Sequence, residues 1–265
     1  MIEINKIYNE NCLDTMKRMP DNFVDLTVTS PPYDNLRDYK GYIFPFEDIA
    51  RELYRITKQG GIVVWVVADG TVNGSRTGTS FRQALYFIEI GFNLHQRLFY
   101  EKSGPPPDQT RYEETIEEMF VFSKGKPKTI NLIRDKKNRW AGVMPFGHRT
   151  IREKDGSLSP KPIRVINEYS KRTSVWRYAT GHNHSCEDDC AFEHPAIFPE
   201  LLAGDHIISW SNEGDLVYDP FMGSGTTAKI AHKLKRNWIG SEISKKYVEL
   251  AEKRIAPYLA QKSLF

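Results

Sequence analysis

Cysteines and long apolar runs are both scarce in this chain of 265 residues. Its cysteines, Cys12, Cys186 and Cys190, are too few and odd in number, which argues against a disulfide framework. No stretch approaches the ~18 uncharged apolar residues of a membrane-spanning helix. The first residues also lack the basic and apolar regions of a signal peptide. We therefore expect a cytoplasmic protein that is not bound to a membrane.

Repeats and compositional bias are absent as well. The 18 glycines and 15 prolines follow no period. No segment of ~20–50 residues recurs, which excludes solenoids and propellers. The composition likewise excludes collagen-like and broadly disordered chains. At ~150 residues per domain, the length fits one large domain or one domain with a sizeable insertion.

Net charge is only +3, but it is distributed unevenly. Between Lys124 and Arg177 there are 15 Lys and Arg against 4 Asp and Glu, so the rest of the chain is acidic. A basic segment of this kind is either a solvated surface insertion or a binding site for a polyanion. Charge alone does not distinguish the two.

Strand and helix patterns alternate on both sides of the basic segment. Phe46–Lys58 has apolar residues at helical spacing, and we take the following Gly60-Gly61 as the stop of that helix. The apolar run Ile62–Ala68 then predicts a strand covered on both faces. This alternation predicts an open, doubly wound α/β domain with a mostly parallel sheet and the basic segment as an insertion.

Two further helices are expected from apolar spacing. One covers Ser80–Ile90, with Phe81, Leu85 and Ile88 as its apolar residues, and the other lies near Pro195–Gly204. Since ligands bind at the carboxyl ends of strands in this fold, the residues that follow the strands are the most informative ones.

A glycine-rich turn follows the strand predicted at Leu216–Asp219. The segment Asp219–Thr227, here called the glycine turn, reads Asp-Pro-Phe-Met-Gly-Ser-Gly-Thr-Thr. Gly223 and Gly225 let the chain turn sharply and let a ligand approach the main chain. The lysine of a phosphate-binding loop and the third glycine of the dinucleotide motif are missing. The pattern predicts a pocket for a nucleotide-like ligand.

An acidic residue follows the next predicted strand, Asn237–Gly240. Glu242 lies 17 to 19 residues after the two glycines, close to the ~20 at which an acid binds ribose in doubly wound sheets. We predict that Glu242 binds ribose hydroxyls; the alternative is that it caps the following helix. Asp219 is placed to hold the cationic end of an amino-acid moiety.

Two consecutive prolines follow another predicted strand, Phe23–Thr29. In Ser30-Pro31-Pro32-Tyr33 they fix an extended and rigid exit from the strand. The Ser30 hydroxyl and the Pro31 carbonyl would accept hydrogen bonds from an exocyclic amino group, with Tyr33 stacked on its ring. The alternative is an ordinary proline-rich turn after an edge strand.

Together the two motifs resemble those of the DNA amino-methyltransferases, which transfer a methyl group from S-adenosylmethionine to N4 of cytosine or N6 of adenine. Ser30–Tyr33 matches the family's catalytic motif, Asp/Asn/Ser-Pro-Pro-aromatic, and Asp219–Thr227 matches its cofactor motif, Asp-Pro-Phe-x-Gly-Ser-Gly-Thr-Thr. The order of the motifs resembles the β group of that family. The resemblance implies the fold of S-adenosylmethionine-dependent methyltransferases, with a catalytic part (1–123), a target-recognition insertion (124–178) and a cofactor-binding part (179–265).

The resemblance also assigns roles to residues. Asn11–Asp14 resembles the segment on the adenine side of the cofactor, and Glu193–Pro199 resembles the segment that packs on its methionine moiety. The implied catalytic residues are Ser30, Pro31, Pro32 and Tyr33. The implied cofactor-binding residues are Cys12, Asp14, His194, Pro195, Asp219, Phe221, Gly223, Ser224, Gly225, Thr226, Thr227 and Glu242.

Double-stranded DNA is the implied partner. The target base would be flipped out of the duplex to reach the active site, while basic residues would contact phosphates, which position a protein without reading sequence. The candidates for these contacts, as a group, are Lys102, Arg134, Lys136, Lys137, Arg139, Arg149, Arg152, Lys154, Arg164, Lys171 and Arg172.

Ser30 bears on the target base. A serine at the first motif position is more usual among the family's cytosine-N4 members and aspartate among the adenine-N6 members, so we favour cytosine. The alternatives within the enzyme class are methylation of N6 of adenine and methylation of an RNA or protein substrate. Two alternatives outside it are a nicotinamide-dependent oxidoreductase and a DNA-binding module with an inactive cofactor site. A homodimer and a companion restriction endonuclease are left open.

A cluster of metal-ligand residue types precedes the second half of the domain. His182, His184, Cys186, Cys190 and His194 could bind zinc by type, but their spacing matches no standard zinc finger. We expect no metal here and instead a loop in which His194 belongs to the segment beside the cofactor.

Overall fold

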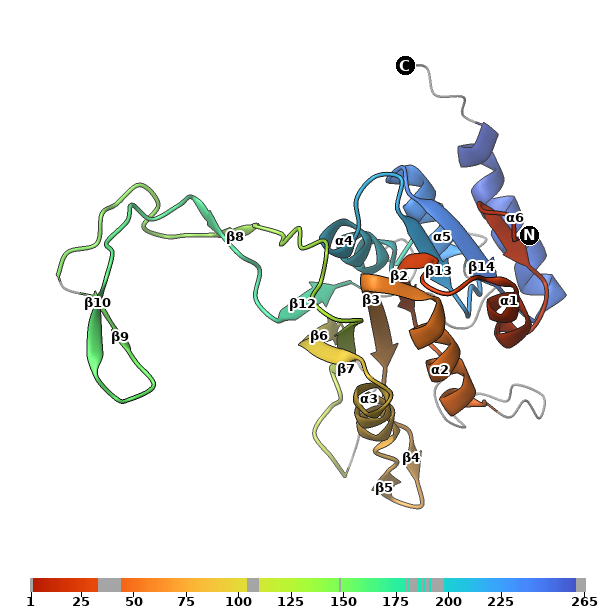
Figure 1. The fold of residues 1–265 in the computed structure, drawn as a ribbon, viewed down its shortest axis with the longest axis horizontal. Helices are drawn as coiled ribbons and strands as arrows, with labels where there is room; N and C mark the ends of the chain where they lie inside the picture. The colour runs from red at the N-terminus through yellow and green to blue at the C-terminus, as the bar shows by residue number, and fades with distance from the viewer. Residues whose placement is uncertain are drawn as a thin grey trace. The chain divides into compact units, whose positions relative to one another are not determined.

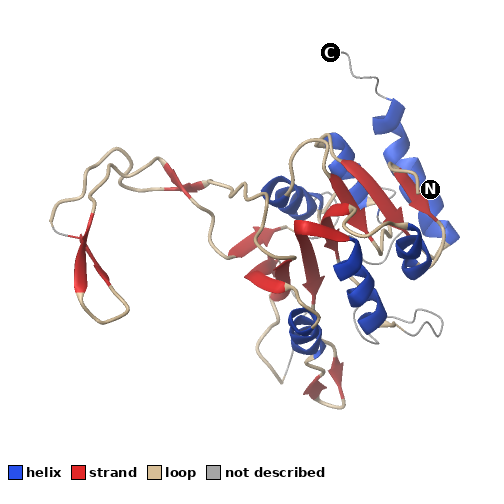
Figure 2. Ribbon diagram, viewed as in Figure 1, coloured by secondary structure: helices blue, strands red, loops and turns tan. Residues whose placement is uncertain are grey.

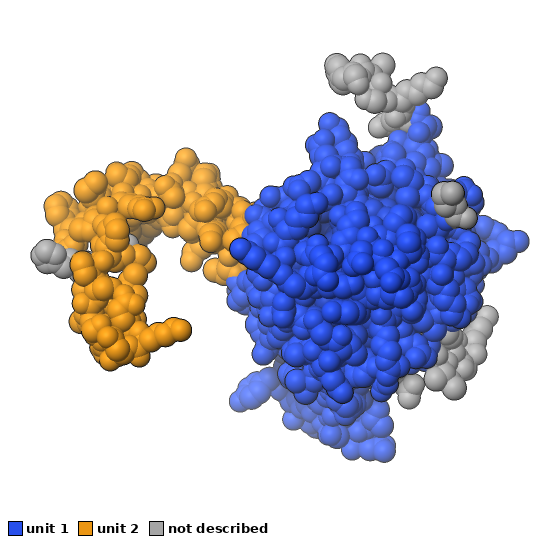
Figure 3. Space-filling view, in the orientation of Figure 1, with its two compact units in different colours: residues 1–131, 174–265 blue, residues 132–173 orange. Residues whose placement is uncertain are grey.

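The structure is a computed structural model and describes residues 2–32, 44–103, 110–147, 149–179, 181, 185–186, 188, 191 and 198–260. The chain forms two compact units (Figure 3). Unit 1 comprises Met1–Asn131 and Ser174–Phe265, and unit 2 comprises Leu132–Thr173. The insertion was expected to span residues 124–178. Unit 2 is shorter, because residues 124–131 and 174–178 belong to unit 1.

Within the described residues of unit 1, eight strands form one sheet (Figure 1). They are β1 (Lys6–Tyr8), β2 (Val24–Thr29), β3 (Thr57–Val67), β6 (Asn93–Lys102), β7 (Ile116–Ser123), β12 (Val175–Tyr178), β13 (Leu216–Asp219) and β14 (Asn237–Ser241). Their order is β1-β14-β13-β2-β3-β7-β6-β12. Only the two pairs that contain β7 are antiparallel. The expectation of a mostly parallel sheet is confirmed.

Helices cover both faces of this sheet (Figure 2). Residues of the first three helices contribute to one apolar cluster, and residues of the last three contribute to the other. None of the described helices combines the length and the apolar composition needed to cross a membrane. The helices are α1 (Cys12–Arg18), α2 (Phe46–Ile56), α3 (Thr79–Glu89), α4 (Glu200–Trp210), α5 (Thr226–Lys233) and α6 (Lys245–Ala260).

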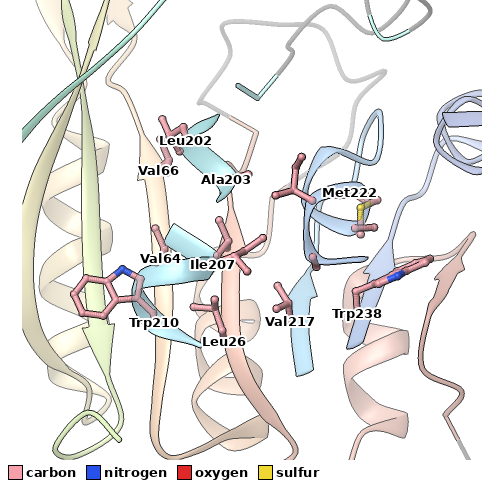
Figure 4. Packing of buried hydrophobic residues seen from close by; sticks show 14 of the residues in the cluster. Leu26, Val64, Val66, Leu202, Ala203, Ile207, Trp210, Val217, Met222 and Trp238 are labelled. Atoms are coloured by element: carbon pink, nitrogen blue, oxygen red, sulfur yellow. The ribbon is translucent and has the colours of Figure 1, made fainter. Parts of the chain in front are cut away.

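Side chains of β3 alternate between the two faces of the sheet. Val63, Trp65 and Val67 belong to the cluster beneath α1, α2 and α3, whereas Val64 and Val66 pack with residues of α4 (Figure 4). Alternate residues of a strand point to opposite faces, and both faces of β3 are buried. An almost continuous apolar run is therefore what this position in the sheet requires, as the sequence predicted.

The predicted role of Gly60-Gly61 as a helix stop was wrong. Helix α2 ends at Ile56, and the two glycines lie inside β3. The Gly60 amide donates to the carbonyl of Lys124 at 2.7 Å. A Cβ on Gly60 would lie 2.8 Å from the Lys128 Cβ, and its φ is +78°. Glycine is needed here because another part of the chain passes close to the strand.

The α3 helix differs from its prediction in orientation. Phe81, Leu85 and Ile88, the expected apolar face, are 54%, 66% and 42% exposed. The helix instead buries a different face, in which the Gln83 side chain accepts a hydrogen bond from the indole N–H of Trp65 at 2.8 Å. A buried indole N–H requires a partner, so a polar residue takes an inward position.

The helix predicted near Pro195–Gly204 ends later than expected. Its described part, α4, begins at Glu200 and runs through Gly204 to Trp210, whereas Pro195–Ile197 lie outside the described residues. Gly204 does not end the helix: a Cβ there would lie 3.4 Å from Ile230 of α5. Gly204 therefore lies at the contact between α4 and α5 and not at the end of the helix.

Unit 2 consists of two antiparallel ribbons and connecting segments. One ribbon pairs β8 (Lys136–Lys137) with β11 (Tyr169–Ser170), and the other pairs β9 (Arg149–Arg152) with β10 (Leu158–Lys161). Among its described residues none is buried, and Phe146 is fully exposed. Unit 2 thus has no hydrophobic core of its own in the described part of the chain.

Candidate active site

Three neighbouring strands end at the same edge of the sheet. β2, β13 and β14 are adjacent and parallel, and their last residues are Thr29, Asp219 and Ser241. The carboxyl ends of parallel strands share one edge, where doubly wound folds bind ligands. The two prolines after β2, the glycine turn after β13 and Glu242 after β14 therefore leave the sheet side by side.

A buried hydrogen bond joins two of these strand ends. The Thr29 hydroxyl donates to Asp219 Oδ1 at 2.6 Å, and the Phe221 amide donates to the same oxygen at 3.0 Å. Thr227 adds a second link by donating to the Val28 carbonyl at 3.4 Å. These contacts tie the end of the strand that carries Ser30 to the glycine turn.

Asp219 is a buried carboxylate with a perturbed pKa. Burial raises the pKa of its carboxyl, while hydrogen bonds from Thr29 and Thr227 oppose the increase. A nearby cation would favour the ionised form, because opposite charges within a few ångströms stabilise it. This environment suits the predicted contact with a cationic amino group.

The backbone of the glycine turn is fixed by close packing. Gly223 and Gly225 have φ of +52° and +83°, a region that other residues adopt rarely. A Cβ on Gly225 would lie 2.8 Å from the Ala251 Cβ in α6. The side chain of Met222 packs over β14, where a Cβ on Gly240 would clash with it. The turn is thus held in one shape by α6 and β14.

Glu242 connects the third strand end to the glycine turn. Its Oε2 accepts a hydrogen bond from the Gly223 amide at 2.9 Å, and its Oε1 accepts from the Ser244 amide at 2.8 Å. Burial raises the pKa of its carboxyl, against the hydrogen bonds from Ser244 and Gly223. The carboxylate thus satisfies an amide just before α6, as the capping alternative expects. A carboxylate can accept further hydrogen bonds, so ribose binding by Glu242 stays a prediction.

The remaining cofactor candidates differ in exposure. Cys12 is buried at the start of α1, and burial raises the pKa of its thiol to about 12, so the thiol offers only a neutral surface. Asp14 is exposed and pairs with Lys17 at 3.4 Å. Phe221 is half-buried, with its ring against those of Phe44 and Trp65.

Several predicted residues lie outside the part that the structure describes. They include Tyr33, His194 and Pro195, whereas Ser30 and Pro32 are half-buried and Pro31 is buried. Of the five residues weighed as zinc ligands and expected to bind no metal, only Cys186 is described, and it is buried. The other four are His182, His184, Cys190 and His194. Among the described residues, no three metal-ligand side chains lie together so that they could hold a metal ion.

The basic candidates fall into two groups. The first group is exposed in unit 2 and comprises Arg134, Lys136, Lys137, Arg139, Arg152, Lys154, Arg164 and Lys171. The side chain of Arg149 lies outside the described part. Arg172 pairs with Asp135 at 2.5 Å, and Lys102 pairs with Glu117 at 2.8 Å, so their charges are partly compensated.

Lys124 was wrongly counted with the exposed basic segment. Its ammonium group donates to Asn22 Oδ1 at 3.0 Å and to the carbonyl oxygens of Tyr54 and Thr57 at 2.8 and 3.0 Å. The residue is buried, and burial lowers the pKa of its amine. Lys124 therefore joins structural elements of unit 1.

Sequence reasoning missed a buried ionic cluster beside the glycine turn. Lys229 of α5 and Arg254 of α6 form ion pairs with Asp188 and Glu200. The available signal was a charged residue among apolar neighbours in each helix. That signal indicates a buried ion pair, but it does not identify the acidic partners.

Comparison with known proteins gives three consistent findings. Residues 24–253 match the family described as DNA methylase. The orphan methyltransferase M.BamHII of Bacillus amyloliquefaciens is 56% identical over 241 residues, which cover 90% of this chain and 91% of that protein. The cytosine-N4-specific PvuII DNA methyltransferase has a similar structure, with a TM-score of 0.67, 19% identity, and 96% and 90% of the two chains covered.

A further solved structure holds the methyl donor. The complex of M1.HpyAVI with S-adenosylmethionine matches with a TM-score of 0.61 and 21% identity, covering 94% of this chain and 98% of that one. At this identity the two solved structures indicate the same fold. The predicted methyltransferase fold is confirmed.

Proposed function

The chain belongs to the DNA methylase family, and we propose that it methylates N4 of cytosine in duplex DNA with S-adenosylmethionine as methyl donor. Methylation of an exocyclic amino group of DNA is the reaction of this family, so the enzyme class follows from membership. The nicotinamide-dependent oxidoreductase is excluded on the same ground. The choice of cytosine and the roles of individual residues are the proposal.

One observation carries the assignment of the site. The hydrogen bond between Thr29 and Asp219, 2.6 Å long, joins the end of β2 to the glycine turn. Ser30 follows Thr29 directly, so the proposed acceptor site and the proposed donor site leave adjacent strands. Transfer between two bound groups requires that they be held close and aligned, and the adjacent strand ends support such an arrangement.

The residues of the proposed donor site fit the chemistry of S-adenosylmethionine. Glu242 would accept from the ribose hydroxyls, and the buried Asp219 would attract the amino group of the methionine moiety. The positive φ of Gly223 and Gly225 leaves the main chain open to close approach. When bound, S-adenosylmethionine would supply an electrophilic methyl group on a sulfonium.

Ser30 and Pro31 would prepare the base for attack. The amino nitrogen of cytosine is a weak nucleophile because its lone pair is delocalised into the ring. Hydrogen bonds from its N–H groups to the Ser30 hydroxyl oxygen and the Pro31 carbonyl would favour a tetrahedral nitrogen and free that lone pair. Since a serine hydroxyl is a poor base, the displaced proton would pass to water. This is preorganisation by fixed acceptors.

Two features favour cytosine over adenine. The first residue of the catalytic motif is Ser30, whereas aspartate is more usual in relatives that methylate adenine. The structurally similar PvuII enzyme is cytosine-N4-specific by name.

The close relative named an orphan methyltransferase supports an enzyme that acts without a companion endonuclease. A homodimer stays a prediction, as does a cytoplasmic location, which a chromosomal substrate in a bacterium would require.

The deciding experiment identifies the product. Purified protein is incubated with mixed-sequence duplex DNA and labelled S-adenosylmethionine, and the DNA is digested to nucleosides for mass spectrometry. We expect labelled N4-methylcytosine. Labelled N6-methyladenine would overturn the choice of base, and methylation of RNA or protein in preference to DNA would overturn the choice of substrate.

Unit 2 is the proposed DNA-binding part. Its sequence carries 11 Lys and Arg against 4 Asp and Glu. Trp140 and Phe146 are 61% and 100% exposed, although both are large and apolar. Phosphate contacts by the basic residues, together with aromatic contacts to bases, would use both features.

Reversing two charges in unit 2 should weaken DNA binding. In K136E/K137E we expect affinity for duplex DNA to fall at least about tenfold, and the dependence of log affinity on log salt to become shallower by about two. Fluorescence anisotropy at several salt concentrations measures both. K246E/K253E changes the same number of charges on exposed lysines of α6 and controls for net charge. Equal losses in the two variants would contradict the assignment.

A further inference from the structure

Four charged side chains meet beneath the glycine turn. The side chains of Lys229 and Arg254 have no exposed surface, and those of Asp188 and Glu200 are 22% and 9% exposed. Lys229 Nζ lies 2.7 Å from both Asp188 Oδ2 and Glu200 Oε1. Arg254 Nε lies 2.7 Å from Asp188 Oδ2, and its Nη2 lies 2.5 Å from Glu200 Oε1. Each base therefore contacts both acids.

The third nitrogen of Arg254 reaches the glycine turn itself. Its Nη1 donates to the Ser224 carbonyl at 2.8 Å, to the Ser224 hydroxyl at 3.0 Å and to the Thr226 hydroxyl at 3.1 Å. The planar guanidinium thus connects the acids to the turn, which a lysine's single ammonium does not reproduce.

The charges are stabilised as a set. Although burial lowers the pKa of Lys229, its hydrogen bonds to Asp188 and Glu200 raise it to about 12. Burial alone would raise the pKa of Asp188, but the hydrogen bonds from Lys229 and Arg254 lower it below its usual value. Both shifts favour the charged forms of Lys229 and Asp188. Buried ion pairs contribute little net stability compared with apolar packing, so stability alone is a weak reason for it.

The cluster joins four segments of the chain next to the glycine turn. Glu200 begins α4, Lys229 lies in α5 directly after the glycine turn, and Arg254 lies in α6. Asp188 comes from the segment before α4. Arg254 contacts both acids, Asp188 and Glu200, and it also contacts the glycine turn.

We propose that Arg254 is a positioning residue of the cofactor site, which holds Ser224 and Thr226 so that the glycine turn keeps the shape that binds S-adenosylmethionine. The inference rests on the proposed function, because it assumes that this turn binds the methyl donor. Arg254 would act through the turn and would touch neither substrate.

Arg236 provides a natural comparison. Its guanidinium donates to the Ser211 hydroxyl and carbonyl at 3.1 and 2.8 Å and to the Leu234 carbonyl at 2.6 Å. Ser211 follows α4 and Leu234 follows α5. Arg236 therefore ties the carboxyl ends of the same two helices whose amino ends Arg254 ties. The hydrogen bonds of Arg254 reach the glycine turn, whereas those of Arg236 reach Ser211 and Leu234.

Two charge-neutral double substitutions test the proposal. R254M/E200Q removes one base and one acid together with the contacts to Ser224 and Thr226. K229M/D188N also removes one base and one acid but retains Arg254 and its contacts to the turn. Calorimetry on the purified full chain gives the Kd for S-adenosylmethionine, and thermal unfolding by circular dichroism reports stability. Binding by the unsubstituted protein is measured first.

We expect R254M/E200Q to raise the Kd at least about tenfold, equivalent to about 1.4 kcal/mol, with kcat at saturating cofactor within about threefold because the turn does not perform the chemistry. K229M/D188N should keep its Kd within about threefold. Equal effects in the two variants, or a lower melting temperature with an unchanged Kd in R254M/E200Q, would overturn the proposal.

Conservative substitutions provide a second test if R254M/E200Q fails to fold. R254K keeps the charge but loses the fork, and we expect its Kd to rise about fivefold, whereas R236K should bind as tightly as the unsubstituted protein. An unchanged Kd in R254K would overturn the role of Arg254. Absence of binding by the unsubstituted protein would instead overturn the proposed function, which separates the two failures.

Discussion

Replacing Ser30 by alanine is expected to lower turnover by about two orders of magnitude, the size of effect seen when one preorganised hydrogen-bonding group is removed from an active site. The hydroxyl would accept a hydrogen bond from the target amino group, so its loss weakens transition-state binding. Affinity for S-adenosylmethionine should stay unchanged, because the Ser30 hydroxyl is proposed to bind the target base, whereas the glycine turn after β13 is proposed to bind the cofactor. Single-turnover rates and calorimetry measure the two quantities.

A buried serine elsewhere controls for general effects of this substitution. Ser209 is 2% exposed, and its hydroxyl donates to the Asp205 carbonyl within α4. S209A should leave both turnover and cofactor affinity unchanged. If S30A turned over at the normal rate, or if its loss of turnover were matched by an equal loss of cofactor affinity, the catalytic assignment would fail.

Replacing Gly225 by alanine should affect the donor site instead. The new Cβ would lie 2.8 Å from the Ala251 Cβ, and the φ of +83° is unfavourable for alanine. Strain and overpacking together should destabilise the protein by about 2 kcal/mol or more. Because the turn must move to relieve the clash, we expect cofactor affinity to fall more than about tenfold. Chemical denaturation and calorimetry measure these effects.

Gly214 is a matched control for this prediction. Its φ is +84°, and a Cβ there would meet nothing within 4 Å. G214A therefore imposes similar backbone strain without the clash, at a position in the turn before β13. It should lose about 1 kcal/mol of stability and keep its cofactor affinity. Equal cofactor affinities in G225A and G214A would show that the shape of the glycine turn is not what matters.

Most of the fold could be predicted from local sequence patterns. The alternation along β3 and the glycine turn after β13 depend on residues that are close in sequence, and the order of parallel strands places their ends together. The errors arose where distant segments decide the outcome. Gly60 serves a close approach by Lys128, and Gln83 turns inward because the Trp65 indole needs an acceptor.

The site shows the same division. Ser30, the glycines and Glu242 stand in recognisable motifs, so sequence alone selects them. Arg254 was missed because its role depends on Asp188 and Glu200, which are 66 and 54 residues away. The hydrogen bond of Thr29 to Asp219 spans 190 residues. Polar partners brought together by folding leave no spacing rule in the sequence.

The lack of a core in the described part of unit 2 has an evolutionary consequence. Most substitutions that are lost from a population are lost because they destabilise folding, chiefly by disturbing buried side chains. Unit 2 has no buried side chain among its described residues, whereas the glycine turn of unit 1 is constrained by contacts from several elements. Substitutions in unit 2 are therefore expected to cost little folding stability. Under the proposed role of unit 2 in DNA binding, target preference would diverge between relatives while the residues around the glycine turn change little.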